Sequence, residues 1–210
     1  MKVTEQLFKS IIKGCVSAYE DECGRLRTER FSQYQKDTIG KLIARNVHQQ
    51  AGMRLDFYTD AESIEMAFEY AYNTSRLFMS VDVYVDGLMS YVYFERNCID
   101  NKQGEFKYVF EKKGRKRVCV YLPFSVELLI TRFELEGAEF VTPYEDHAGF
   151  VYVVGDSITQ GFDTEYTSYS YVNLAMRRLN LDYLHQGRRH YQYRTLSLSP
   201  LPDRFCNHTR

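Results

Sequence analysis

The sequence predicts a chain in two parts: an antiparallel β-sandwich with flanking helices, followed by the opening of a parallel α/β domain. Apolar residues recur at helical spacing before Gly52 and alternate with polar residues after it. Glycine, proline and Asp-Gly turns divide the alternating region into short segments, which is typical of sandwiches. After Gly149 an apolar run, a loop, a helical period and a second apolar run follow in order, which indicates a βαβ unit.

Helices are predicted at two places before the sandwich. Apolar residues at helical spacing predict the first, and Gly14 ends it; they are Leu7, Phe8, Ile11 and Ile12. The stretch from Ser32 to Gln35 fits a capping box, in which the serine oxygen accepts a bond from the N–H three residues on. Gly52 ends this second helix. Its apolar stripe comprises Ile39, Leu42, Ile43 and Val47.

Alternating segments predict the strands of the sandwich. These segments are residues 53–58, 64–70, 81–85, 88–94, 107–110, 117–122 and 125–136. Asp86-Gly87 is a strong hairpin turn signal. Each predicted strand has one apolar and one polar face, as a two-sheet sandwich requires. The chain holds 18 Tyr and 14 Phe but no Trp, and these aromatic residues favour strands.

The predicted domains are a sandwich over residues 1–142, a linker over 143–149, and the start of an α/β domain over 150–187. The linker breaks the alternation with Pro143 and Gly149. In the α/β part, residues 151–154 form a strand, 169–179 a helix and 181–184 a second strand. Residues 188–210 are an irregular tail with no sustained period.

Charge and cysteine usage narrow the class of partner and compartment. The formal net charge of −1 gives no reason to expect a nucleic-acid partner, so the basic run from Glu111 to Arg117 is interpreted as a charged hairpin tip around Gly114. No run is long enough to span a bilayer, and the N-terminus lacks the apolar core of a signal peptide. The cysteines lack metal-ligand spacing, which predicts free thiols, no metal and a cytoplasmic location. No cofactor is indicated.

Ser157 is the candidate catalytic residue. It follows the apolar run 151–154, and chemistry in open α/β sheets sits beyond the carboxyl ends of such strands. A serine there can be the nucleophile, and its own N–H can stabilise the oxyanion. Asp156 is expected to brace the turn, and Gly161 to let the chain bend. The alternatives are a plain strand-to-helix turn capped by Ser157 and a phosphate-binding loop.

The stretch Gly155-Asp156-Ser157-Ile158-Thr159-Gln160-Gly161 resembles the first block of the SGNH (GDSL) hydrolases. "SYSYVNLAMRRLNLDYLHQG", from Ser168 to Gly187, resembles the first helix and second strand of that family. "RFSQYQ", "HQQAGMRLDFYTD" and "YLPFSVEL" resemble the jelly-roll domain that precedes the hydrolase domain in one subgroup. The resemblance implies a jelly-roll-like sandwich, a flavodoxin-like α/β domain, and a serine esterase or acylhydrolase. A carbohydrate deacetylase acting on a small acyl ester or an acetylated carbohydrate is one form of this activity.

The sequence departs from the family pattern after Ser157. In the second block, His185 stands where the family has asparagine, Gly187 is a candidate oxyanion support, and the oxyanion glycine position falls on His190. Neither a Gly-x-Asn-Asp block nor an Asp-x-x-His block follows, so no general base is identified. His147, in the linker four residues before the strand, and His190, after the second strand, are alternatives for that base, although His190 is better explained as a surface histidine of the tail.

The tail suggests that the chain is a disrupted copy of a longer enzyme. We expect a frameshift or truncation after Gly187, because one helix and two strands cannot bury the core of a doubly wound domain. The chain itself is then expected to be inactive, and its strand edges could drive self-association. The alternative is a non-catalytic module that binds a carbohydrate or a protein. Its tyrosine-rich strands could form a sugar-stacking face, or the rings could pack between the sheets.

Overall fold

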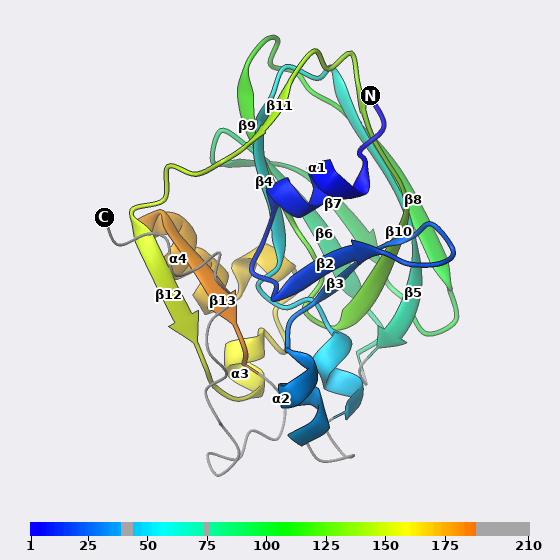
Figure 1. Cartoon of the computed structure of the whole chain (residues 1–210), viewed down its shortest axis with the longest axis vertical. Coiled ribbons are helices and arrows are strands. Elements are labelled where there is room, and N and C mark those ends of the chain that lie inside the picture. The colour runs from blue at the N-terminus through cyan, green and yellow to red at the C-terminus, as the bar shows by residue number, and fades with distance from the viewer. Residues whose placement is uncertain (39–43, 74–75, 188–210) are drawn as a thin grey trace.

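The computed structural model describes residues 1–38, 44–73 and 76–187, and it contains an antiparallel sandwich of two sheets (Figure 1). The first, the six-stranded sheet, has the order β1-β4-β9-β6-β7, with β11 paired to β4; the second, the five-stranded sheet, has the order β2-β3-β10-β5-β8. The first comprises β1 (Ile12–Lys13), β4 (Arg54–Thr59), β6 (Met79–Val85), β7 (Leu88–Glu95), β9 (Lys116–Tyr121) and β11 (Val141–Pro143). The second comprises β2 (Ser17–Glu20), β3 (Leu26–Glu29), β5 (Ser63–Asn73), β8 (Gln103–Val109) and β10 (Val126–Glu136).

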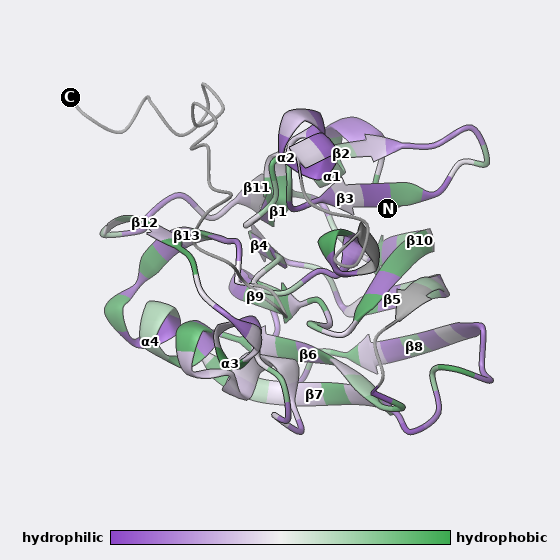
Figure 2. Cartoon of the chain, turned by 90° about the horizontal axis from the view of Figure 1, so that it is seen from below, coloured by the Kyte–Doolittle hydropathy of each residue, from purple (hydrophilic) through white to green (hydrophobic). Residues whose placement is uncertain are grey.

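The core lies between the two sheets and follows from the alternating sequence. Residues such as Phe57 on β4, Val83 on β6 and Phe68 on β5 are almost fully buried and belong to one apolar cluster. Figure 2 shows the alternation as bands of high and low hydropathy along the strands. Burying one side chain in two along each strand supplies most of the apolar area that holds the sheets together. The predicted antiparallel sandwich is confirmed.

The first predicted helix is confirmed. The second, predicted from Ser32 to Gly52, is confirmed at its start, but residues 44–48 form a 3₁₀ turn and residues 49–51 are not helical. α1 spans Glu5–Ile11 and ends before Gly14. α2 spans Gln33–Thr38, and its capping box is present: the Gln35 N–H donates to Ser32 Oγ at 3.2 Å, and the Ser32 N–H donates to Gln35 Oε1 at 2.9 Å. Val47 lies in the 3₁₀ turn η1 (Ala44–His48). The other stripe residues, Ile39, Leu42 and Ile43, lie outside the described residues.

One predicted hairpin is confirmed and another is wrong. Asp86 and Gly87 have φ values of 49° and 85°, the positive pair that a type I′ turn between β6 and β7 requires. The basic run after β8 is not a hairpin tip. β8 pairs with β5 in one sheet and β9 pairs with β4 and β6 in the other, so this run crosses between the sheets. Turn residues reveal that the chain bends, but they do not specify which strand it then joins.

The tyrosine-rich strands pack inward. The hydroxyl oxygens of Tyr70 and Tyr93 are 3.0 Å apart, and a Cβ placed on Gly104 would lie within 2.4 Å of both. The Tyr91 and Tyr108 rings stack with centroids 5.3 Å apart. Of the two interpretations of these residues, packing between the sheets is the one that the structure supports.

The α/β unit lies on one side of the sandwich, beside the six-stranded sheet (Figures 1 and 2). Its strands β12 (Gly149–Val153) and β13 (Leu181–His185) are parallel and in register from Gly149 opposite Leu181. Between them come α3 (Ser157–Gln160), the 3₁₀ turn η2 (Thr167–Tyr169) and α4 (Tyr171–Leu179). The predicted strand–helix–strand order is confirmed. β11 ends at Pro143, the first residue of the predicted linker.

The α/β unit covers polar side chains of the sandwich. Arg54 and Asp56 on β4 and Asp82 on β6 point away from the apolar core, yet each is at most 2 % exposed. The predicted polar face is therefore present on β4 and β6, but it is buried, because η2, α4 and β13 pack over it. Buried charges need partners, and Asp182 of β13 supplies one for Arg54 at 2.7 Å.

Candidate active site

Ser157 is the first residue of α3, at the carboxyl end of β12. Asp156 caps this helix: its Oδ1 accepts from the N–H groups of Ile158 at 3.0 Å and Thr159 at 3.3 Å. Gly161 ends the helix with a φ of 103°, a left-handed conformation that favours glycine. The local sequence thus forms a tight strand–turn–helix that presents Ser157 at the edge of the sheet.

The Ser157 side chain is half-buried, while Asp156 is exposed. The cap engages the N–H groups of the two residues after Ser157. Within the described residues, neither the N–H nor the hydroxyl of Ser157 has a hydrogen-bond partner. Both groups are therefore available to a bound molecule, as a nucleophile and an oxyanion donor at one position would need to be.

Gly187 lies beside α3, where a Cβ on it would meet Thr159 and Gln160 at 2.9–3.0 Å. Its N–H donates to His185 Nδ1 at 3.2 Å, and its carbonyl accepts from Arg30 Nη1 at 2.8 Å. The N–H that would have to face an oxyanion is thus engaged by the histidine ring. In this arrangement Gly187 shapes the loop but does not offer its N–H to a substrate.

His185 is a structural histidine at the same edge of the sheet. Gly187 donates to its Nδ1, so its Nε2 carries the proton and donates to the Thr159 carbonyl at 2.7 Å. Burial, together with the nearby Arg30 guanidinium, lowers the pKa of His185 to about 3. A neutral ring with both nitrogens occupied cannot accept the Ser157 proton. The sequence signal for this residue was that histidine replaces the family's asparagine.

His147 lies at the other end of the strand pair. It precedes β12, whose four steps from Gly149 to Val153 span about 13 Å, and Ser157 follows β12. Its ring packs edge-on against Tyr144, and burial, with Arg54 nearby, lowers the pKa of His147 to about 4. His190 lies outside the described residues. In the described part of the chain, no histidine hydrogen-bonds Ser157.

Polar side chains of the sandwich hold the carboxyl edge in place. Gln160 of α3 donates to Gln49 Oε1 and to the Phe124 carbonyl at 3.1 Å. Gln35 of α2 donates to Gln186 Oε1 at 2.9 Å. These residues are nearly fully buried, so their mutual bonds compensate for lost hydration. The sandwich thus fixes the loop that follows β13 as well as α3.

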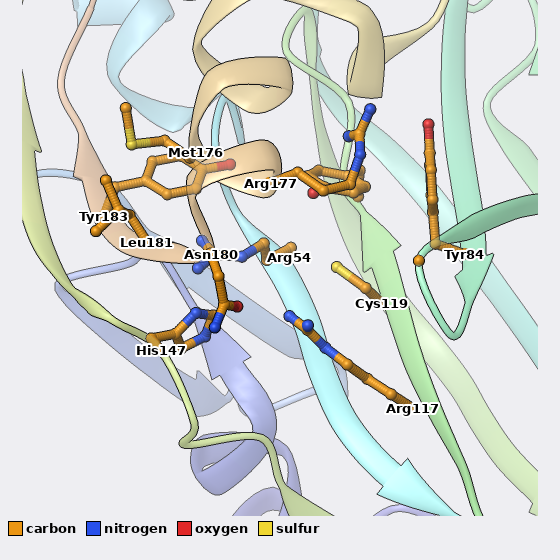
Figure 3. A pocket seen from close by; sticks show the side chains of 12 residues that line it. Arg54, Tyr84, Arg117, Cys119, His147, Met176, Arg177, Asn180, Leu181 and Tyr183 are labelled. Atoms are coloured by element: carbon orange, nitrogen blue, oxygen red, sulfur yellow. The ribbon is translucent and has the colours of Figure 1, made fainter.

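The amino edge of the same strand pair encloses a small cavity of about 30 Å³ between β4, β6, β9, α4 and β13 (Figure 3). Arg54 Nη2 donates to Asp182 Oδ1 at 2.7 Å, which joins the sandwich to the α/β unit. Arg117 binds both oxygens of Asp56, at 2.9 and 2.8 Å. The Arg54–Asp182 pair is thus an ionic contact between the two parts of the chain, whereas the Arg117–Asp56 pair lies within the six-stranded sheet.

Metal and membrane features are absent from the described residues. No group of three or more His, Cys, Asp or Glu side chains there could hold a metal ion. No helix in the described ranges is long and apolar enough to cross a bilayer. Cys23 and Cys119 are free thiols, and Cys206 lies outside the described residues.

Comparison with known proteins identifies the fold. No family model and no curated protein matches the chain. Among solved structures, the salicylyl-acyltransferase SsfX3 from a tetracycline biosynthetic pathway matches with a TM-score of 0.69 and 22% identity, over 84% of this chain and 50% of that one. A predicted GDSL-like lipase from Bacteroides ovatus matches with a TM-score of 0.66 and 16% identity, over 89% and 56%. A family two carbohydrate esterase from Cellvibrio japonicus matches with a TM-score of 0.56 and 14% identity, over 90% and 52%.

The chain spans about half the length of these structures. At this level of identity the likeness concerns the fold, and it extends over most of this chain. The chain is therefore structurally similar to GDSL-like and family two esterases across a region that includes an antiparallel two-sheet sandwich.

Proposed function

We propose that the chain carries the nucleophile-bearing portion of an SGNH-type serine ester hydrolase. The observation that carries this proposal is Ser157 itself, whose hydroxyl and N–H are both unengaged at the carboxyl end of a parallel strand. The motif around it and the shared fold support the same family. The α/β unit would be the first part of the hydrolase domain, and the sandwich the domain that precedes and supports it.

In the proposed reaction, Ser157 Oγ attacks the acyl carbonyl while a base removes its proton, and the Ser157 N–H donates to the resulting oxyanion. Collapse of this intermediate expels the alcohol, and water then releases the acyl group as a carboxylate. Asp156 holds the turn through its bonds to Ile158 and Thr159. The base would come from outside the described residues, since His185 is occupied and His147 lies at the other edge.

The proposed substrates are small acyl esters, including acetylated carbohydrates. The structural relatives include an acyltransferase and carbohydrate esterases, which share acyl transfer from or to an oxygen. A half-buried serine on the short helix that the exposed Tyr171 contacts is compatible with a small acyl group and a larger alcohol. Tyr171 is fixed there by a 3.0 Å hydrogen bond between its hydroxyl and Thr159 Oγ1.

Hydrolysis of p-nitrophenyl acetate by this chain and its Ser157→Ala variant tests the proposal, with and without added imidazole as an external base. We expect equal rates without imidazole, because the described residues offer Ser157 no base. Imidazole is expected to produce a Ser157-dependent increase above its own background rate. Equal rates for both proteins at every imidazole concentration would count against Ser157 as a nucleophile.

The second candidate is a non-catalytic carbohydrate-binding module. It is favoured by the exposed rings of Tyr169 and Tyr171, since sugars stack on aromatic faces, and by a matched family two esterase from Clostridium thermocellum in complex with cellohexaose. That match has a TM-score of 0.52 and 13% identity, over 67% of this chain. Calorimetric titration with cellohexaose tests it: binding that Tyr169→Ala and Tyr171→Ala weaken would support the module, and no heat of binding would reject it for this sugar.

A further inference from the structure

The cavity at the amino edge is lined by three guanidinium groups and by no carboxylate. Arg54, Arg117 and Arg177 all contribute to its wall, and His147 closes one side. Figure 3 shows Arg54, Arg117 and His147 directed toward the same space. The neighbouring carboxylates lie behind this wall: Asp182 pairs with Arg54, and Asp56 pairs with Arg117.

The three guanidinium groups of the cavity wall differ in their partners. Within the described residues Arg177 has no carboxylate partner; it donates to the Ser168 carbonyl at 3.2 Å and lies over the Tyr84 ring at 4.4 Å. The nearby carboxyl is Asp82, and burial raises its pKa, which favours the uncharged acid. Among the described residues, Arg54 and Arg117 are thus held in ion pairs, whereas Arg177 forms none.

Polar atoms of the wall also lack hydrogen-bond partners. Arg54 is 2 % exposed, and its Nη1 is buried with no partner among the described residues. The same holds for both ring nitrogens of His147, although Nε2 lies 3.5 Å from Asp56 Oδ2. A buried donor without an acceptor is costly, and a charged donor more so. An acceptor that enters the cavity would relieve both residues.

We propose that this cavity binds a small carboxylate anion, of about the size of acetate, between Arg54 Nη1 and the imidazole of His147. The cavity volume of about 30 Å³ has room for about two water-sized groups, so it would admit the two carboxylate oxygens and leave the methyl group of acetate at its opening. Arginine favours planar carboxylates because its N–H groups lie in one plane. The site lies at the opposite end of β12 and β13 from Ser157, so it does not depend on the proposed hydrolase activity.

Thermal unfolding in sodium acetate and in sodium chloride of equal ionic strength tests this site. We expect acetate to raise Tm above the chloride value by about 3 °C at ten times the dissociation constant. Arg54→Lys keeps a cation beside Asp182 but removes the planar pair of terminal guanidinium nitrogens. His147→Phe keeps the packing on Tyr144 but removes the ring nitrogens. Each is expected to weaken acetate binding at least about tenfold, the cost of one charge-assisted hydrogen bond.

His48→Phe is the matched control, because His48 lies near Glu127 of the five-stranded sheet and away from the cavity. This variant should keep the full acetate effect. Equal Tm values in acetate and chloride for the unmodified chain would mean that the cavity holds water only. An acetate effect that persists in His147→Phe, which leaves the Arg54–Asp182 pair intact, would place the binding elsewhere. Either result overturns the proposal.

Discussion

The two ends of the β12–β13 pair are built in opposite ways. At the carboxyl end, Ser157 is half-buried and its hydroxyl has no partner among the described residues. At the amino end, Arg54 and Asp182 are buried and joined at 2.7 Å. One end leaves a reactive group open, and the other fixes charged groups to one another. The difference separates the region proposed to carry chemistry from a region that attaches the α/β unit to the sandwich.

Each end also holds one histidine, and the contrast explains why neither acts on Ser157. His185 is at the carboxyl end, but its ring is locked between Thr159 and Gly187. His147 has unengaged nitrogens, but it lies at the amino end. One histidine is thus at the same end as Ser157 but has no unengaged nitrogen, and the other has unengaged nitrogens but is at the opposite end. A general base needs both proximity and an unengaged nitrogen.

The largest expected effect comes from breaking the ion pair at the amino end. Asp182→Ala leaves the Arg54 charge buried without its closest partner, so we expect a loss of about 3 kcal/mol in the free energy of unfolding. The carboxylate of Asp56, 3.9 Å from Arg54 Nε, keeps the loss near the low end of the usual range. Urea unfolding followed by circular dichroism measures it. Glu105→Ala, which removes an exposed partner of Arg132, is the control and should have no measurable effect.

A loss below about 1 kcal/mol for Asp182→Ala would mean that the joint between the two parts does not depend on this pair.

A smaller loss is expected at the carboxyl end. His185→Leu leaves the Thr159 carbonyl and the Gly187 N–H without their partner in the interior, which should cost about 2 kcal/mol. His185→Asn, which retains a donor and an acceptor, should cost less. If both variants unfold at the same urea concentration as the unmodified chain, His185 does not lock this edge.

Stability should also depend on pH through the two histidines. Their folded-state pKa values, about 4 for His147 and about 3 for His185, lie below the unfolded value of about 6.5. The unfolded chain therefore binds protons that the folded chain does not, and stability present above pH ~6.5 is lost as the pH falls. Each histidine can contribute up to about 1.4 kcal/mol per pH unit. Urea unfolding between about pH 5 and 6.5 gives the change in the free energy of unfolding with pH. This change should be smaller for His147→Phe than for the unmodified chain; an unchanged pH dependence would contradict the burial of the neutral His147 ring.

The smallest expected effect is at Ser157. Because its side chain has no partner among the described residues, Ser157→Ala should change the free energy of unfolding by less than about 0.5 kcal/mol. The same urea titration measures it, with Ser170→Ala as the comparison. Ser170 caps α4 by accepting from the Asn173 N–H, so its loss should cost about 1 kcal/mol. A large loss for Ser157→Ala would assign the serine a structural role in the turn.

Local patterns predicted the elements that depend on neighbouring residues. The capping box at Ser32, the turn at Asp86-Gly87 and the strand that leads to Ser157 all follow from residue types a few positions apart. The passage of the chain from one sheet to the other near Gly114 could not be predicted from local residue types, because turn residues do not specify the partner strand.

Long-range burial could not be inferred in the same way. The polar face of β4 looks solvent-exposed in an alternating sequence, and only the packing of α4 and β13 buries Arg54 and Asp56. Likewise, His185 was visible as a departure from the family pattern, but its locked ring depends on contacts with Thr159, 26 residues away. The motif located the serine proposed as the nucleophile, while the state of the histidines depends on the assembled fold.

The most direct measurement is to locate the acyl group after treatment with p-nitrophenyl acetate in the presence of imidazole, by mass spectrometry of peptides. If Ser157 is a nucleophile that lacks only a base, the peptide containing Ser157 should carry an acetyl group on that serine. The peptide containing Ser170, whose hydroxyl caps α4, should remain unmodified at that serine. Acetylation of lysines alone, with Ser157 unmodified, would contradict the assignment of Ser157 as the nucleophile.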